Sequence, residues 1–196
     1  KFYYLDLDHF DQIITTKYPA WMVRHPNHVC YMAHRLRGVY DTYHMTGLPD
    51  EVDDRNIHIN KVIRYMDQKG STLEGLFDAL DQLYRAHRAQ EKVPQEYFAL
   101  PGPFLRKIIH FMDDKALSPR RIRKFYAISQ NVKNRAEYYP DDVQVKVVYP
   151  PSSLPEFRQG SFDYLFTISR LDKPKRISLM IEAMKYVDAD IQLKIA

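Results

Sequence analysis

The sequence predicts an α/β fold with parallel β-sheets. Three observations indicate it. Apolar runs of strand length alternate with amphipathic stretches of helix length along the 196 residues. The run at 28–33 is too apolar for a solvent-facing edge strand. Near the end of the sequence, a strand, a helix and a second strand follow one another, an order that favours parallel pairing.

Three β-prone runs open the chain, and three amphipathic helices follow. The expected strands are Phe2–Leu7, Phe10–Thr16 and His28–Ala33. The expected helices place apolar residues on one face over 59–66, 73–84 and 104–112. Ser71-Thr72-Leu73-Glu74 has the form of a capping box, so we expect Ser71 to cap the second helix and Glu74 to reach back to it.

Strand character returns after the third helix. We expect a strand over Phe125–Ser129, a helix over Gln130–Tyr138 capped by Ser129, and a strand over Val143–Tyr149. The prolines of 150–155 break regular structure and mark a domain boundary. The expected βαβ unit comprises Tyr164–Ser169, Ile177–Tyr186 and Ile191–Ala196. The expected organisation is therefore a first domain at 1–149, a linker at 150–160 and the start of a second domain at 161–196.

Composition narrows the class of protein. The chain has 29 Lys and Arg against 25 Asp and Glu, and this net charge of +4 does not by itself indicate nucleic-acid binding. Cys30 is the single cysteine, which excludes an intrachain disulfide and fits a reducing, cytoplasmic compartment. No apolar run approaches the ~18 residues of a membrane span. His25 and His28 flank Pro26 and are expected to have a structural role in a loop.

The segment 166–184 carries the strongest functional signal. A predicted strand ends at Ser169, a helix begins near Arg176, and Arg170 and Lys175 lie in the loop between them. Ligands of open parallel sheets bind at the carboxyl ends of the strands. Two cations beside a helix N-terminus suit a diphosphate. The alternative is a surface turn whose charges are solvated.

This segment resembles the family-4 retaining glycosyltransferases of the GT-B fold. The resemblance implies that Arg170 and Lys175 bind the diphosphate of a nucleotide-sugar, with Arg176 replacing a commoner Gly. It also implies a fold of Rossmann-like parallel sheets, with most of the N-terminal, acceptor-side domain and only the first βαβ unit of the C-terminal, nucleotide-sugar-binding domain.

Two further blocks are similar to the same family. The first comprises 127–135, Tyr138-Tyr139 and 145–151, which resemble its interdomain crossing. The second, 17–41, resembles a stretch in which a strand ends in a histidine of the cleft. The matching residue is His34, which the resemblance places near the sugar and the reacting hydroxyl. The alternative is a histidine that only ends a strand. Arg35 and Arg37 either hold an anionic acceptor or are solvated.

The resemblance implies a retaining transfer of a hexose from a nucleotide-sugar to a glycan or lipid-linked acceptor, in glycan, polysaccharide or glycolipid synthesis. Arg and Lys take the place of a metal in this fold, so no metal or other cofactor and no nucleic acid is expected. The family's Gly-rich loops and Glu-x7-Glu motif are not found in the sequence, so we expect no appreciable activity from this chain alone. Self-association through an unpaired sheet edge and peripheral contact at the inner membrane surface are further expectations.

A rival interpretation comes from the basic run Arg120–Lys124. Such a run is typical of a non-catalytic module that binds nucleic acid or acidic lipid, although it also fits a solvated lead-in to the next strand. Asp6-Leu7-Asp8 matches the Asp-x-Asp pattern of metal-dependent glycosyltransferases, but a three-residue pattern arises often by chance.

Overall fold

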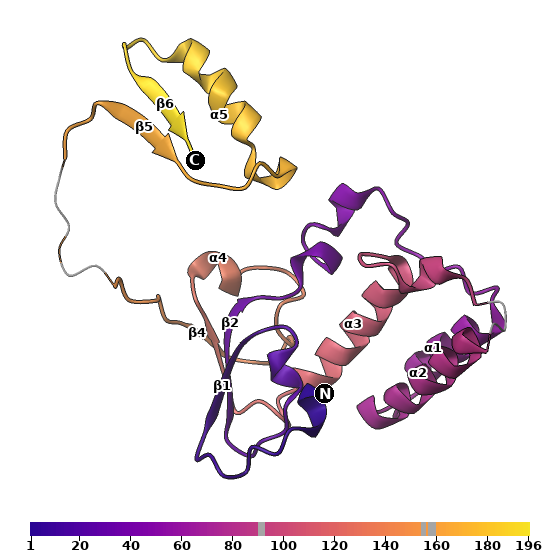
Figure 1. Ribbon diagram of the computed structural model, residues 1–196. Coiled ribbons are helices and arrows are strands. Elements are labelled where there is room, and N and C mark those ends of the chain that lie inside the picture. The colour runs from indigo at the N-terminus through magenta and orange to yellow at the C-terminus, as the bar shows by residue number, and fades with distance from the viewer. Residues whose placement is uncertain (90–92, 154–155, 157–159) are drawn as a thin grey trace. The chain divides into compact units, whose positions relative to one another are not determined.

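The computed structural model describes residues 1–89, 93–153, 156 and 160–196. The chain forms two compact units, Lys1–Pro150 and Pro151–Ala196 (Figure 1). Part of the linker expected at 150–160 lies outside the described residues.

A four-stranded parallel sheet forms the centre of the first unit. Its strands follow the order β1 (Ile13–Lys17), β2 (His28–His34), β3 (Lys124–Ala127) and β4 (Val145–Val147). All three pairings are parallel. The predicted α/β class with a parallel sheet is therefore confirmed for this unit, and β2 lies inside the sheet, as its apolar sequence indicates.

Three helices lie on one side of this sheet. They are α1 (Ile57–Asp67), α2 (Leu73–Arg88) and α3 (Pro103–Ala116), and each contains the apolar stretch that predicted it. Helix α3 lies between the sheet and the α1–α2 pair (Figure 1). Its Ile109 packs in a cluster with the strands, whereas its Ile108 packs in a second cluster with α1 and α2. This helix therefore connects the two cores of the unit.

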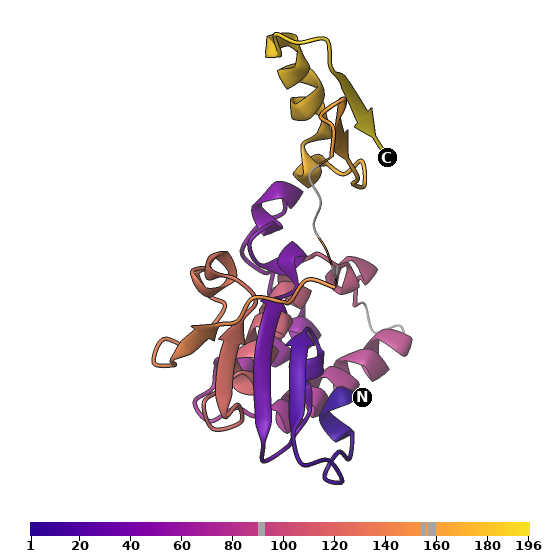
Figure 2. The ribbon, with the colours of Figure 1, turned by 90° about the vertical axis from the view of Figure 1, so that its left-hand side faces the viewer.

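The opposite face of the sheet is open within the described part of this unit. Figure 2 shows the strands in front and the helices α1–α3 behind them. On the open face Ile14 is 61% exposed, and Tyr31 and Tyr126 are half-buried. Parallel sheets are usually covered on both faces, so this arrangement departs from the usual pattern.

The first β-prone run is not a strand. Phe2–Tyr4 forms a short 3-10 turn, η1, and the strand expected at Phe10–Thr16 begins only at Ile13. Tyr3 is buried, with its ring edge-on to Phe77 of α2 and its hydroxyl donating to Glu74. Packing against a distant helix therefore overrides the local preference of these residues for a strand.

The cap of α2 lies one residue later than the sequence predicts. Thr72 is the N-cap, and its Oγ1 accepts from the amide of Gly75 at 3.2 Å. Ser71 is buried and donates to the carbonyl of Met66. Glu74 accepts a hydrogen bond from Tyr3. The predicted hydroxyl-to-amide bond is present, but it comes from the neighbouring residue.

In the segment after β3, the predicted N-cap is confirmed, and the helix is shorter than predicted. Ser129 Oγ accepts from the amide of Val132 at 3.2 Å, as expected of an N-cap. Helix α4 spans only Gln130–Lys133, whereas the prediction extended it to Tyr138. Glu137 adopts a left-handed φ of 62°, which a continuing α-helix does not allow.

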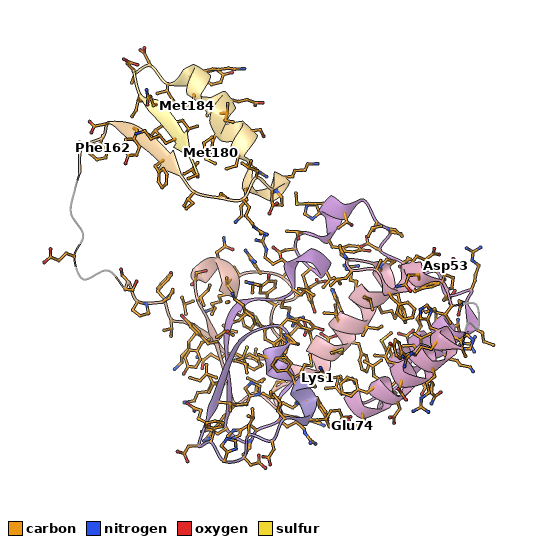
Figure 3. All side chains as sticks on the ribbon, viewed as in Figure 1. Lys1, Asp53, Glu74, Phe162, Met180 and Met184 are labelled. Carbon is orange, nitrogen blue, oxygen red and sulfur yellow. The ribbon has the colours of Figure 1, made fainter. Side chains whose placement is uncertain are left out.

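The second unit is a βαβ unit. Strands β5 (Tyr164–Thr167) and β6 (Gln192–Ile195) pair in parallel, which confirms the predicted pairing. Between them lie the turn η6 (Lys173–Lys175), the helix α5 (Ile177–Ala183) and the turn η7 (Met184–Tyr186). Met180 and Met184 lie on the α5–η7 segment (Figure 3).

We predict that Thr72→Ala lowers the free energy of unfolding by about 1 kcal/mol, because the Gly75 amide loses its partner at the start of α2. Thr72→Ser keeps a hydroxyl and should cost much less. Urea unfolding of both variants checks this. Equal losses from the alanine and serine variants would show that the cap contributes nothing.

Candidate functional site

His34 is the last residue of β2, at the carboxyl edge of the first sheet. Its Nδ1 lies 2.7 Å from the carbonyl oxygen of Arg35. A carbonyl only accepts, so Nδ1 carries the proton, and the neutral ring has an acceptor at Nε2. The histidine is half-buried. The ring is thus held by one nitrogen, and the other can accept from a hydroxyl.

Arg35, directly after His34, is a structural residue. It is 3% exposed, and its Nη1 donates to the Tyr40 hydroxyl at 2.7 Å. Its Nε donates to the carbonyl of Tyr138 at 3.3 Å. Both roles predicted for Arg35, holding an anionic acceptor or lying in solvent, are wrong. Its guanidinium is buried and bonded to Tyr40 and Tyr138, so it contacts neither an acceptor nor solvent.

Asp113 of α3 completes this buried network. Its Oδ1 accepts from Trp21 Nε1 at 2.8 Å, its Oδ2 accepts from the Tyr40 hydroxyl at 2.9 Å, and Arg35 Nη1 lies 4.0 Å from Oδ2. Burial raises the pKa of Asp113 to about 6, against the lowering effects of Trp21 and Arg35. The sequence analysis missed this residue. Its one signal is an aspartate four residues after Ile109, on the apolar face of the helix.

A second polar network surrounds Asp41. Arg37 Nε donates to Oδ2 at 2.8 Å, and the Tyr138 hydroxyl donates to Oδ1 at 2.9 Å. Arg135 Nη1 lies 3.5 Å from Oδ2 and donates to the Tyr138 hydroxyl at 2.9 Å. Burial alone would raise the pKa of Asp41, but the bonds from Arg37 and Tyr138 hold it below its ordinary value.

The Asp41 network joins residues from the two blocks, 17–41 and 127–151, that resemble the same family. Asp41 is the last residue of the 17–41 block, Arg135 ends the stretch 127–135, and Tyr138 begins the tyrosine pair. Arg37 is exposed and pairs with Asp41, so both roles expected for it, holding an anionic acceptor and lying in solvent, stay predictions.

The second unit holds the other two predicted site residues, both in the loop after β5. Arg170 is 81% exposed, and its Nε lies 3.3 Å from Asp172 Oδ2. Lys175 is exposed and ends η6. Arg176, the N-cap of α5, adopts a left-handed φ of 52°. Glycine is the residue that adopts this conformation at least cost.

The two histidines that flank Pro26 have structural roles. His25 Nε2 lies 2.9 Å from the Phe10 carbonyl, as expected of a loop histidine. His28 instead lies buried in β2, with Nε2 2.8 Å from Thr15 Oγ1, and burial with a contribution from Arg121 lowers its pKa to about 4. In the part of the chain that the structure describes, no three His, Cys, Asp or Glu side chains gather as a metal-ligand set.

The basic run Arg120–Lys124 is not one solvated face. Arg121 is half-buried and donates to the carbonyls of Met22 and Val23, at 2.9 and 3.2 Å. Arg123 and Lys124 are exposed, and Lys124 already belongs to β3. The run therefore divides between the interior and the surface.

No family model, curated protein or solved structure matches the chain. Among the described residues, no helix is both long and apolar enough to cross a membrane.

We predict that Asp113 makes the stability of the first unit depend on pH. The folded chain binds the Asp113 proton more tightly than the unfolded chain, whose carboxyl has a pKa near 3.8. The stability that this carboxyl contributes is therefore greatest below pH 4 and is lost as the pH rises through about 6, by about 3 kcal/mol. Urea unfolding of the wild type and of Asp113→Asn over this range measures the difference. Asp81→Asn controls for the net charge, and parallel profiles for wild type and Asp113→Asn would contradict the prediction.

We also predict that Arg176→Gly leaves the stability of the second unit unchanged or raises it by up to about 1 kcal/mol, because glycine adopts the left-handed conformation without a Cβ clash. Arg176→Val should destabilise the unit, since a β-branched residue is an outlier there. Amide hydrogen exchange in β5 and β6 reports both effects. Faster exchange in the glycine variant than in the valine variant would be inconsistent with the assigned backbone.

Proposed function

We propose that the chain belongs to a retaining glycosyltransferase that moves a hexose from a nucleotide-sugar to an acceptor hydroxyl. The observation that carries the proposal is the loop after β5, where Arg170 and Lys175 are both exposed and Arg176 holds a left-handed conformation. The resembling family commonly has glycine at that last position, and the conformation explains why glycine would suit it.

The two cations suit the diphosphate of the donor. A leaving nucleoside diphosphate gains negative charge in the transition state, and a guanidinium and an ammonium placed there stabilise it. Arg170 currently pairs with Asp172, but an exposed ion pair contributes little, so a diphosphate can replace the carboxylate. Helix α5 has only seven residues, so the side-chain charges supply most of the attraction.

His34 fits the acceptor side of this reaction. With Nδ1 held by the carbonyl of Arg35, its Nε2 can accept a hydrogen bond from a sugar or acceptor hydroxyl. The Arg35 side chain is fixed in turn by Tyr40 and by the charge of Asp113. A buried network thus positions a half-buried histidine, as the supporting residues of an active site do.

The proposal predicts that the chain binds nucleoside diphosphates through the loop after β5. Titration calorimetry with UDP, GDP and ADP should show binding of at least one of them. Arg170→Gln and Lys175→Gln should each weaken it by about tenfold, because each removes one charge from the diphosphate.

Lys185→Gln provides the matched control, since it removes an exposed lysine from η7 in the same unit. It should leave the affinity within about twofold of wild type. Absence of binding of all three nucleotides at millimolar concentration, or equal losses in all three variants, would count against the glycosyltransferase proposal.

A further inference from the structure

A cavity of about 690 Å³ lies in the first unit, and neither His34 nor the Asp41 network lines it. Its charged lining consists of Arg24, Arg120 and Arg121, together with Asp6 and Asp8. The volume lies within the range of ~300–1,000 Å³ that small-molecule sites occupy.

The cavity sits at the amino-terminal edge of the sheet. Asp8 precedes β1, Arg24 precedes β2, and Arg120 and Arg121 precede β3. The strands are parallel, so their starts share one edge, and their carboxyl ends, including His34, share the other. The cavity is therefore a different site from the one that the proposed function uses.

Tyr3 holds two of the arginines in place. The guanidinium carbon of Arg24 lies 4.9 Å from the centre of the Tyr3 ring, and that of Arg121 lies 5.3 Å from it. The ring itself is buried, and its hydroxyl donates to Glu74 at the start of α2. Glu74 lies beside the N-terminal segment (Figure 3). Stacking on an aromatic face fixes a guanidinium without using its hydrogen-bond donors.

The arginines keep donors for a ligand. Arg121 Nη2 donates to two backbone carbonyls, and these bonds orient the remaining nitrogens of the guanidinium. In residues 1–89, 93–153, 156 and 160–196, no carboxylate forms an ion pair with Arg24, Arg120 or Arg121. Guanidinium groups bind phosphate through two parallel hydrogen bonds.

The other lining residues select among phosphorylated ligands. Asp6 Oδ1 accepts from the backbone amide of Asp8, which leaves oxygens of both carboxylates available to accept from ligand hydroxyls. The same carboxylates repel a second phosphate, so a polyanion such as nucleic acid is disfavoured. Tyr4 also lines the cavity and is 64% exposed, which offers a ring face for the carbon skeleton of a sugar or polyol.

We propose that this cavity binds a phosphorylated polyol, with the phosphate on the arginines and the hydroxyls on the aspartates. Two sources share this chemistry: a soluble sugar phosphate, and the headgroup of an inositol phospholipid. The inference is independent of the proposed glycosyl transfer.

The test uses the full chain and titration calorimetry with glucose 6-phosphate, inorganic phosphate and glucose. Glucose 6-phosphate should bind about tenfold more tightly than inorganic phosphate, and glucose alone should not bind measurably. Arg24→Gln should weaken binding of glucose 6-phosphate by about tenfold. Asp8→Asn should reduce the preference for glucose 6-phosphate over inorganic phosphate, because an amide accepts hydrogen bonds from the sugar hydroxyls less strongly than a carboxylate does.

Arg123→Gln is the matched control. It removes one exposed charge from the same basic run, outside the cavity lining. Its effect on affinity should stay within about twofold. Equal losses from Arg24→Gln and Arg123→Gln would mean unspecific attraction by positive charge and would overturn the proposal.

A second arm separates the two sources. Vesicles of phosphatidylcholine with and without phosphatidylinositol are sedimented with wild type and with Arg24→Gln. Binding of glucose 6-phosphate without vesicle binding assigns a soluble ligand. Vesicle binding that needs both phosphatidylinositol and Arg24 assigns the lipid headgroup. Failure of both arms overturns the proposal, whatever the nucleotide titrations show.

Discussion

The buried carboxylate of Asp113 is the interaction on which the first unit most depends. It ties α3 to Trp21, which lies before β2, and to Arg35 and Tyr40, which lie after it. Removing either member of a buried charged pair leaves the other without compensation, at a cost of about 3–5 kcal/mol. The position of α3 and the course of the chain beyond β2 are therefore coupled through one side chain.

This coupling extends to the carboxyl edge of the sheet. His34 bonds to the carbonyl of Arg35, and the Arg35 side chain also reaches the carbonyl of Tyr138. Tyr138 in turn donates to Asp41. The histidine is thus supported by two adjoining polar networks, which limits the rotation of its ring and keeps Nε2 in a defined direction.

The arginines differ in how deeply they are buried, and this difference indicates their roles. Arg35 is enclosed and satisfied by fixed partners, so it serves the fold. Arg170 is exposed and pairs with an exposed aspartate, so it can exchange that partner for a ligand. Arg24 and Arg121 lie between these cases, because a buried tyrosine ring orients them while they line an open cavity. Charge counted along the sequence does not distinguish these roles.

The second unit and the open sheet face leave apolar surface in contact with water. Ile168 and Leu171 are largely exposed, and Leu165 and Phe166 of β5 are exposed as well. Ile14 is exposed on the open face of the first sheet. Exposed apolar surface of this kind favours association. The expectation that the chain self-associates through a sheet edge stays a prediction.

The sequence by itself determined the elements whose signal is local. Helices α1, α2 and α3 follow from apolar residues three and four positions apart, and the βαβ order of the second unit follows from alternating strand and helix patterns. The shared loop of Arg170 and Lys175 is local in the same sense, since both residues lie between one strand and the next helix.

Only the tertiary structure decided which polar residues meet. Asp113 is 92 positions from Trp21, and Arg35 is 103 positions from Tyr138, so no periodicity relates them. The same holds for Tyr3, which contacts Glu74 across 71 positions. This contact holds Phe2–Tyr4 as a 3-10 turn, although the local sequence predicts a strand. Local spacing encodes which face of a helix is apolar, whereas the pairing of distant charges depends on how the helices pack against the sheet.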